Sequence, residues 1–119
     1  IATLLLIPTF AHSAGVADLK GTWSGNWQPK GGVVDAVTVE IQEDNGKLTG
    51  KFRSPELMDF TKATFDPKTS ALKLEASDPQ TKKLYRIDGK VDGLEIRGTL
   101  TAGDVVGDLL LIKWTYIPR

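Results

Sequence analysis

The chain has 119 residues, enough for one small domain, and its 15 basic and 15 acidic residues give a formal net charge of zero. Charges of both signs are interspersed along the chain, which argues against a broad electrostatic field for nucleic acid or an anionic membrane. Cysteine is absent, so the chain can form neither disulfides nor thiolate metal sites.

The first 17 residues carry no charge and begin with an apolar run from Ile1 to Phe10. Small residues follow from Ala11 to Gly15. This order is typical of the apolar core and cleavage region of a secretory signal peptide, with cleavage after Ser13, which we prefer, or after Ala17. The run has about half of the ~20 apolar residues that a membrane-spanning helix needs. We therefore expect residues 1–17 to be a signal peptide remnant and residues 18–119 to form a periplasmic or secreted β-barrel domain.

The segment from Gly21 to Gln28 predicts the first strand. Side chains alternate between the two faces of a strand, so Trp23, Gly25 and Trp27 share an apolar face while polar residues share the other. The same spacing of glycine and apolar residues returns at Gly46 to Phe52 and, with one extra residue, at Gly93 to Leu100. A glycine on the inner face lets a strongly bent strand close over its neighbours, as a narrow barrel requires. The alternative is a β-sandwich with ordinary turn glycines.

Further segments repeat the alternation between turn signals. We expect strands at about residues 34–42, 47–53, 60–65, 71–76, 83–91, 94–101 and 106–117. Asn45-Gly46 predicts a tight hairpin, since the turn with the preferred twist needs positive φ at both central residues. In the fourth strand the predicted inner face carries Thr61, Ala63 and Phe65. The sequence thus predicts an all-β fold, a single up-and-down antiparallel barrel of about eight strands.

The last predicted strand is apolar on both faces. Leu109 and Leu111 lie on one face, and Leu110, Ile112 and Trp114 on the other. A strand of this kind is buried on both sides, or one face is covered by another domain or subunit. Leu109 and Leu111 are therefore the candidate interaction residues, for a homo-oligomer or a partner protein.

Catalytic chemistry finds little support in the sequence. The single histidine, His12, falls in the predicted signal peptide, so the mature domain lacks a Ser-His-Asp or Cys-His arrangement and a histidine-rich metal site. No glycine-rich loop leads into a predicted helix, as a phosphate-binding loop requires. We expect no enzyme activity, cofactor or metal. A hydrolase that uses carboxylates alone is a third hypothesis, with Asp88 and Asp92 as its pair.

Aromatic residues carry the leading functional hypothesis. An eight-stranded barrel is filled by its own side chains or holds one small ligand, and ligand pockets are mostly apolar. Trp27, Phe52, Tyr85 and Trp114 are the candidate ligand-binding residues, whereas Trp23 is assigned to the packed core. We expect an exported, non-enzymatic barrel that binds a small apolar ligand in its aromatic interior. The alternative is a filled barrel that acts as an interaction or accessory domain and docks through its last strand.

Several short motifs resemble a lipocalin-like, calycin-type barrel of bacterial exported proteins. They are Gly21–Gly25, Val37–Ile41, Gly46–Gly50, Ser54–Glu56, Ile87–Val91 and Glu95–Leu100. The resemblance covers most of residues 20–114 and implies a barrel that occurs alone or ahead of an α/β-hydrolase domain, whose activity is not carried over. Gly21-x-Trp23 also resembles the first-strand signature of lipocalins and avidins, in which the tryptophan packs across the barrel end. Biotin binding is not implied, because Ser24-Gly25-Asn26 departs from the polar ligand-binding pattern of avidins.

Overall fold

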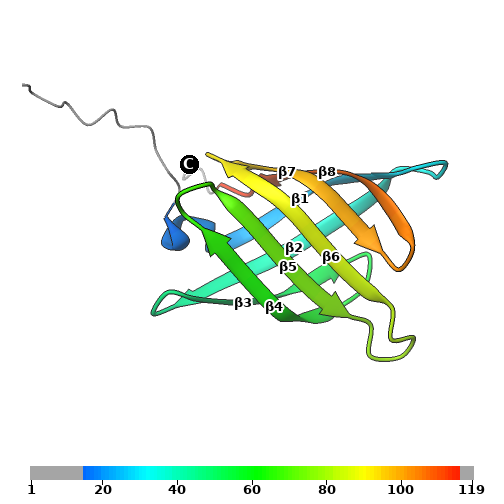
Figure 1. Ribbon diagram of the computed structural model, residues 1–119, viewed down its shortest axis with the longest axis horizontal. Helices are drawn as coiled ribbons and strands as arrows, with labels where there is room; N and C mark the ends of the chain where they lie inside the picture. The colour runs from blue at the N-terminus through cyan, green and yellow to red at the C-terminus, as the bar shows by residue number, and fades with distance from the viewer. Residues whose placement is uncertain (1–14, 116–119) are drawn as a thin grey trace, which may run out of the picture.

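The fold is one antiparallel sheet that closes on itself, as the computed structural model of residues 15–115 shows (Figure 1). The elements are the 3₁₀ turn η1 (Val16–Leu19) and the strands β1 (Gly21–Pro29), β2 (Asp35–Asp44), β3 (Lys47–Ser54), β4 (Met58–Asp66), β5 (Ala71–Ser77), β6 (Leu84–Asp92), β7 (Glu95–Ala102) and β8 (Val105–Lys113). Each strand pairs with the next along the chain, and β8 pairs with β1. The predicted all-β, up-and-down barrel of eight strands is confirmed.

Alternate residues of every strand fill the interior, as a period of two dictates. The buried side chains are Leu19, Trp23, Trp27, Val37, Val39, Ile41, Leu48, Phe52, Met58, Leu72, Leu74, Ala76, Tyr85, Ile87, Val91, Ile96, Leu100, Ala102, Leu109 and Leu111. All are apolar or aromatic, so removal of their surface from water is the main favourable contribution to folding. The assignment of Trp23 to the core is confirmed.

One end of the barrel is closed by η1, which Figure 1 places beside the β4–β5 and β6–β7 turns. The indole N–H of Trp23 donates a 2.9 Å hydrogen bond to the carbonyl of Leu19. Lys113 Nζ donates a 2.8 Å hydrogen bond to the carbonyl of Asp18 and lies 5.8 Å from the centre of the Trp23 ring. The opposite end carries the β1–β2, β3–β4, β5–β6 and β7–β8 connections. We call it the loop end.

The hairpin between β2 and β3 has the predicted geometry. Asn45 has a φ of 53° and Gly46 a φ of 84°, and Asp44 pairs with Lys47 across the turn. Both central residues therefore adopt the left-handed region that a two-residue hairpin of this twist requires.

Glycines allow neighbouring strands to approach closely at the bends of the barrel. A Cβ atom on Gly98 would lie 2.0 Å from the carbonyl oxygen of Asp88, and one on Gly25 would lie 1.8 Å from the carbonyl oxygen of Leu110. Both clashes involve the backbone of a paired strand, which cannot move aside like a flexible side chain. A larger residue at either position is incompatible with the observed curvature.

The predicted inner face of the fourth strand is wrong in its first half. The register of β4 against β5 shifts between Phe60 and Lys62, so Phe60 packs against the core while Thr61 is exposed. Beyond the shift, Ala63 and Phe65 face the core as predicted. A bulge inserts one residue into the alternation and moves every earlier side chain to the other face.

The substitution Gly98→Ala tests the close approach of β6 and β7. We expect it to destabilise the barrel by about 1–3 kcal/mol because the added methyl group forces backbone shifts. The matched control is Gly15→Ala, where the nearest atom to the new Cβ is 3.8 Å away. The measurement is the free energy of unfolding in urea for the three proteins. Equal stability of Gly98→Ala and the unsubstituted chain would contradict the steric argument.

Candidate functional site

Three of the four candidate ligand-binding residues lie together inside the barrel. Trp27, Phe52 and Tyr85 are buried, and the ring centres of Phe52 and Tyr85 are 6.1 Å apart. The indole N–H of Trp27 donates a 2.9 Å hydrogen bond to the carbonyl of Leu100, so its polar atom already has a partner. These residues occupy the half of the interior nearer the loop end.

The fourth candidate, Trp114, lies outside the barrel. Its side chain is 65% exposed, and its indole N–H donates a hydrogen bond of 2.6 Å to Ser24 Oγ on the outer face of β1. The expectation that Trp114 lines the interior is wrong, because β8 ends at Lys113 and even-numbered residues of this strand face outward. It therefore cannot contribute to an interior site in this conformation.

Leu109 and Leu111 point into the barrel, with 4% and 0% of their surfaces exposed. Each is paired with a glycine of a neighbouring strand, Gly98 and Gly25 respectively. Both belong to the buried core cluster, so neither side chain is presented to a partner. The apolar outer face of this strand belongs instead to the even-numbered positions, of which Ile112 is exposed.

Tyr85 lies near the loop end, between two small side chains. Its partners on the neighbouring strands are Ala76 and Ala102, both buried. Lys83 Nζ lies 5.7 Å from the centre of the ring. Burial raises the pKa of the Tyr85 phenol, and the carboxylates of Glu56, Asp78 and Asp35 raise it further. All three carboxylates belong to the loop end, which therefore presents negative charge around the phenol.

The wall of the barrel is least regular between β3 and β4. Their ladder consists of two residue pairs, Lys51 with Asp59 and Phe52 with Met58. On its other side β4 pairs with β5 from Phe60 to Asp66. Residues 47–50 of β3 consequently have no paired residue on β4 in the part of the chain that the structure describes. The two strands diverge toward the end that η1 closes.

A groove of about 370 Å³ occupies this divergence. We call it the seam groove, and its lining residues are Lys47, Leu48, Thr49, Phe60, Thr61, Lys62 and Ala63. Its floor belongs to the core, because Leu48 is buried and Phe60 and Ala63 pack against the buried cluster. Side chains rather than a hydrogen-bonded ladder separate the groove from the interior.

Phe60 connects the groove to the interior aromatic residues. A Cβ on Gly50 would come within 2.8 Å of the Phe60 ring, so the ring covers the bare backbone of β3. The Phe60 and Phe52 rings meet edge to face, with centres 5.7 Å apart and planes at 85°. Since Phe52 also contacts Tyr85, aromatic rings run from the groove to the loop-end half of the interior.

Two lysines flank the seam groove, Lys47 from β3 and Lys62 from β4. Asp44 is paired with Lys47 in the β2–β3 ladder, and Glu75 is paired with Lys62 in the β4–β5 ladder. Neither carboxylate lies within 4.0 Å of the paired lysine's ammonium nitrogen, the limit for an ion pair. Over residues 15–115, ion pairs are found at Arg53–Glu40, Arg86–Asp88 and Arg97–Glu95. Both ammonium groups therefore remain available to an anion.

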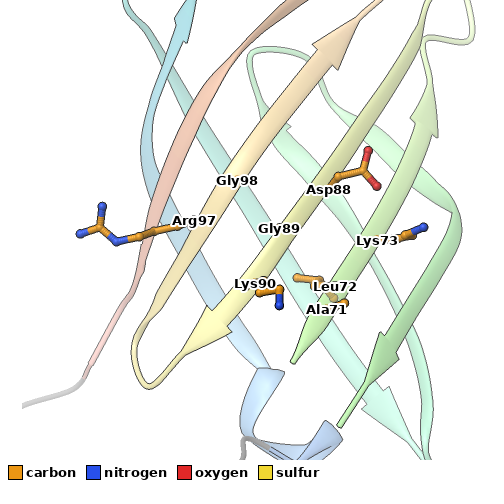
Figure 2. A pocket seen from close by; sticks show the side chains of 8 residues that line it. All are labelled: Ala71, Leu72, Lys73, Asp88, Gly89, Lys90, Arg97 and Gly98. Carbon is orange, nitrogen blue, oxygen red and sulfur yellow. The ribbon is translucent and has the colours of Figure 1, made fainter. Parts of the chain in front are cut away.

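A second hollow, of about 280 Å³, lies on the outside of β5, β6 and β7 (Figure 2). Lys73, Asp88, Lys90 and Arg97 surround it, and Figure 2 shows Arg97 pointing away from Asp88 and Lys73. Arg97 is engaged by Glu95 at 2.9 Å. The paired glycines Gly89 and Gly98 also line this hollow.

The carboxylates singled out for hydrolysis do not converge. Asp88 and Asp92 lie four residues apart on β6, a separation of roughly 13 Å along a strand. Glycoside hydrolases hold their two carboxyl groups about 5–9.5 Å apart.

Among the described residues no group of three His, Cys, Asp or Glu side chains could hold a metal ion.

No protein-family model, curated protein or solved structure matches this chain. The closed, eight-stranded antiparallel barrel is consistent with a lipocalin-like barrel at the level of architecture. None of the helical segments within residues 15–115 is both long and apolar enough to cross a membrane.

The sequence analysis missed the seam groove. Its signal is a break in the alternation of β4, where the apolar residues change from the even positions Met58 and Phe60 to the odd positions Ala63 and Phe65. Such a change of parity indicates a bulge, and bulges are common next to functional sites. The lysines carried no signal of their own, because exposed lysines are frequent on outer strand faces.

The ionisation of Tyr85 provides a test of the loop-end geometry. We expect its phenol to ionise above the ordinary value of 10.0, because burial and three carboxylates disfavour the phenolate. Because the folded-state pKa is raised, the resulting stabilisation is complete below about pH 10 and is lost as the pH rises through the folded-state pKa. The measurement is the difference in phenolate absorbance between the unsubstituted chain and Tyr85→Phe during alkaline titration. A Tyr85 pKa at or below 10.0 would contradict the buried placement.

Proposed function

We propose that the protein is a non-enzymatic barrel that binds a small apolar ligand through the seam groove and the aromatic side chains behind it. The observation that carries this proposal is the short ladder between β3 and β4. It has two residue pairs, whereas every other pair of neighbouring strands has six to eight. Only here does movement of side chains open the wall without breaking an extended row of hydrogen bonds.

The dimensions and chemistry of the groove agree with this role. Its volume of about 370 Å³ falls at the lower end of the range for small-molecule sites. Leu48, Phe60 and Ala63 supply its apolar surface, and Lys47, Thr49, Thr61 and Lys62 supply polar groups. Small-molecule sites combine apolar surface with polar groups that fix the orientation of the ligand.

Phe60 is the side chain whose movement would admit the ligand. It is partly exposed, it follows the edge of the short ladder, and its ring rests on the glycine backbone of Gly50. Rotation of this ring away from Phe52 would expose the inner aromatic residues to the groove. The cost is one edge-to-face aromatic contact, about 0.5–1.5 kcal/mol beyond the area it buries.

The alternative is an accessory domain with a filled core that docks through its outer surface. Ile112 and Trp114 are exposed on the outer side of β8, and Leu94 in the β6–β7 turn is hydrogen-bonded to this strand through its carbonyl. Leu94 is also exposed, with 51% of its surface accessible. A group of exposed apolar side chains is typical of a contact with another protein.

The substitution Ala63→Phe tests the seam groove. We expect it to weaken binding of the neutral apolar fluorophore N-phenyl-1-naphthylamine at least about tenfold, because loss of a few buried methylene contacts is worth more than 1.4 kcal/mol. The matched control is Ala71→Phe in the second hollow, which should leave binding unchanged. The measurement is fluorescence titration, with thermal unfolding to verify that each variant is folded.

Two outcomes would count against the groove as the binding site. Equal effects of Ala63→Phe and Ala71→Phe would mean that the fluorophore does not occupy the groove. Failure of the unsubstituted chain to bind the fluorophore, together with a native mass free of adducts, would favour the filled accessory domain.

We also propose that the protein is exported to the periplasm or beyond, with cleavage after Ser13. Residues 1–14 of the predicted signal peptide remnant, which spans residues 1–17, lie outside the described residues, but η1 begins soon after them. The backbone N–H of Gly15 donates a 2.9 Å hydrogen bond to Asp18, and Val16 packs against the core. A cut after Ser13 leaves these contacts intact, whereas a cut after Ala17 removes them.

The mass of the exported protein tests this cleavage site. We expect the chain, produced in a bacterial host with a basic signal-peptide n-region placed before Ile1 and recovered from the periplasm, to have the mass of residues 14–119. Intact-mass spectrometry gives the answer directly. The mass of residues 18–119 would contradict the preferred site, and retention of the uncleaved chain in the cytoplasm would contradict export.

A further inference from the structure

We infer that the outer face of β1, β8 and β7 binds a neutral, β-1,4-linked oligosaccharide. The inference goes beyond the proposed function, because it concerns the outside of the barrel and does not depend on the seam groove. It follows from a group of polar side chains in register on three strands, with an exposed tryptophan at one end.

The polar side chains lie opposite one another across paired strands. Asn26 on β1 is paired with Leu110 on β8, which is paired in turn with Arg97 on β7. Two residues further along the first two strands, Gln28 is paired with Asp108. They surround a hollow of about 390 Å³, which we call the outer hollow and which is lined by Asn26, Gln28, Arg97, Gly98, Asp108, Leu109 and Leu110.

Trp114 lies beside this group at the end nearer η1. Its backbone N–H donates a 2.8 Å hydrogen bond to the carbonyl of Thr22, and its indole N–H donates to Ser24 Oγ. Ser24 and Asn26 are neighbours on the outer face of β1, because side chains alternate along a strand. The two hydrogen bonds therefore hold the ring next to the outer hollow, while 65% of the surface of Trp114 stays exposed.

The side chains of the outer hollow offer both donors and acceptors of hydrogen bonds. The amides of Asn26 and Gln28 do both, and the carboxylate of Asp108 accepts. Arg97 contacts Glu95 through Nε, and its guanidinium has four further N–H donors. Each hydroxyl of a sugar is a donor and an acceptor at once, so a row of hydroxyls matches this set.

The charges favour a neutral ligand. Glu95 offsets the charge of Arg97, and Asp108 takes part in none of the ion pairs found within residues 15–115. An anion would be repelled by the two carboxylates, and a cation would meet the guanidinium. A wholly apolar ligand would remove water from these polar groups without replacing its hydrogen bonds, which is unfavourable.

The exposed indole and the polar group together favour a chain of pyranose rings. The face of an aromatic ring is negative, so it attracts the partly positive C–H groups on the face of a pyranose. From Ser24, which anchors the indole, the outer face of β1 continues for roughly 13 Å to Gln28. A β-1,4 linkage keeps successive rings in an extended ribbon that can follow this strand, whereas an α-1,4 linkage coils the chain.

Isothermal titration of the full chain with cellohexaose, N-acetylated chitohexaose and maltohexaose tests the inference. The first two probes are neutral and β-1,4-linked, and maltohexaose is neutral and α-1,4-linked. We expect at least one β-linked probe to bind about tenfold or more tightly than maltohexaose.

Two substitutions locate the binding. Trp114→Ala should weaken binding of the β-linked probe at least about tenfold, because the apolar face of the sugar loses its contact. Gln28→Ala should weaken it about threefold through the loss of a hydrogen bond. The matched control is Gln42→Ala, an exposed glutamine on β2, which should bind as the unsubstituted chain does.

Iodide quenching of tryptophan fluorescence tests the same placement without a substitution. Trp23 and Trp27 are buried and Trp114 is exposed, so the quenching by iodide reports on Trp114. We expect a saturating β-linked probe to reduce this quenching. Unchanged quenching at saturation would overturn the placement of the sugar on the indole.

The other outcomes also decide the matter. Absence of binding for both β-linked probes, equal affinity for maltohexaose, or equal weakening by Gln28→Ala and Gln42→Ala would overturn the inference. A dimeric native mass that Trp114→Ala converts to a monomeric one would overturn it as well, since a second copy would then cover this face. None of these results bears on binding of N-phenyl-1-naphthylamine at the seam groove, so the proposed function is judged separately.

Discussion

Closure of a short antiparallel sheet into a narrow barrel is the constraint on which the rest of this structure depends. The closing ladder joins β1 to β8, and it is possible because glycines stand where the two backbones meet. A Cβ on Gly25 would lie 1.8 Å from the carbonyl oxygen of Leu110, and one on Gly107 would lie 2.2 Å from that of Gln28. Once the sheet closes at this curvature, the interior has room for one layer of inward side chains from each strand, and Leu109 and Leu111 are among them.

The wall between β3 and β4 meets the same constraint by different means. A bulge after Phe60 turns this side chain toward the core, and its ring covers Gly50 where the ladder has stopped. Packing therefore closes the wall where hydrogen bonds do not. A contact between rings can open and close at lower cost than a row of backbone hydrogen bonds, so this seam is the entrance that we propose for a ligand.

The two ends of the barrel and the seam differ in charge as well as in structure. η1 and Lys113 close one end over Trp23. At the other end, burial and nearby carboxylates hold the pKa of the Tyr85 phenol above its usual value. The seam groove, in contrast, is lined by two lysines and by no acidic residue.

The sequence by itself determined the all-β class, the approximate strands, the hairpin at Asn45-Gly46 and most of the inner face, because these depend on local alternation and turn chemistry. It also identified Trp27, Phe52 and Tyr85 as interior aromatic residues. Only the tertiary structure decided that Trp114 lies outside, that Leu109 and Leu111 lie inside, and that Phe60, Lys47 and Lys62 meet at one groove. The physical reason is that a strand with two apolar faces does not reveal which face is inward, and a bulge reverses the alternation without a distinctive residue of its own. Register and closure join residues distant in sequence, so the seam exists only in the folded barrel.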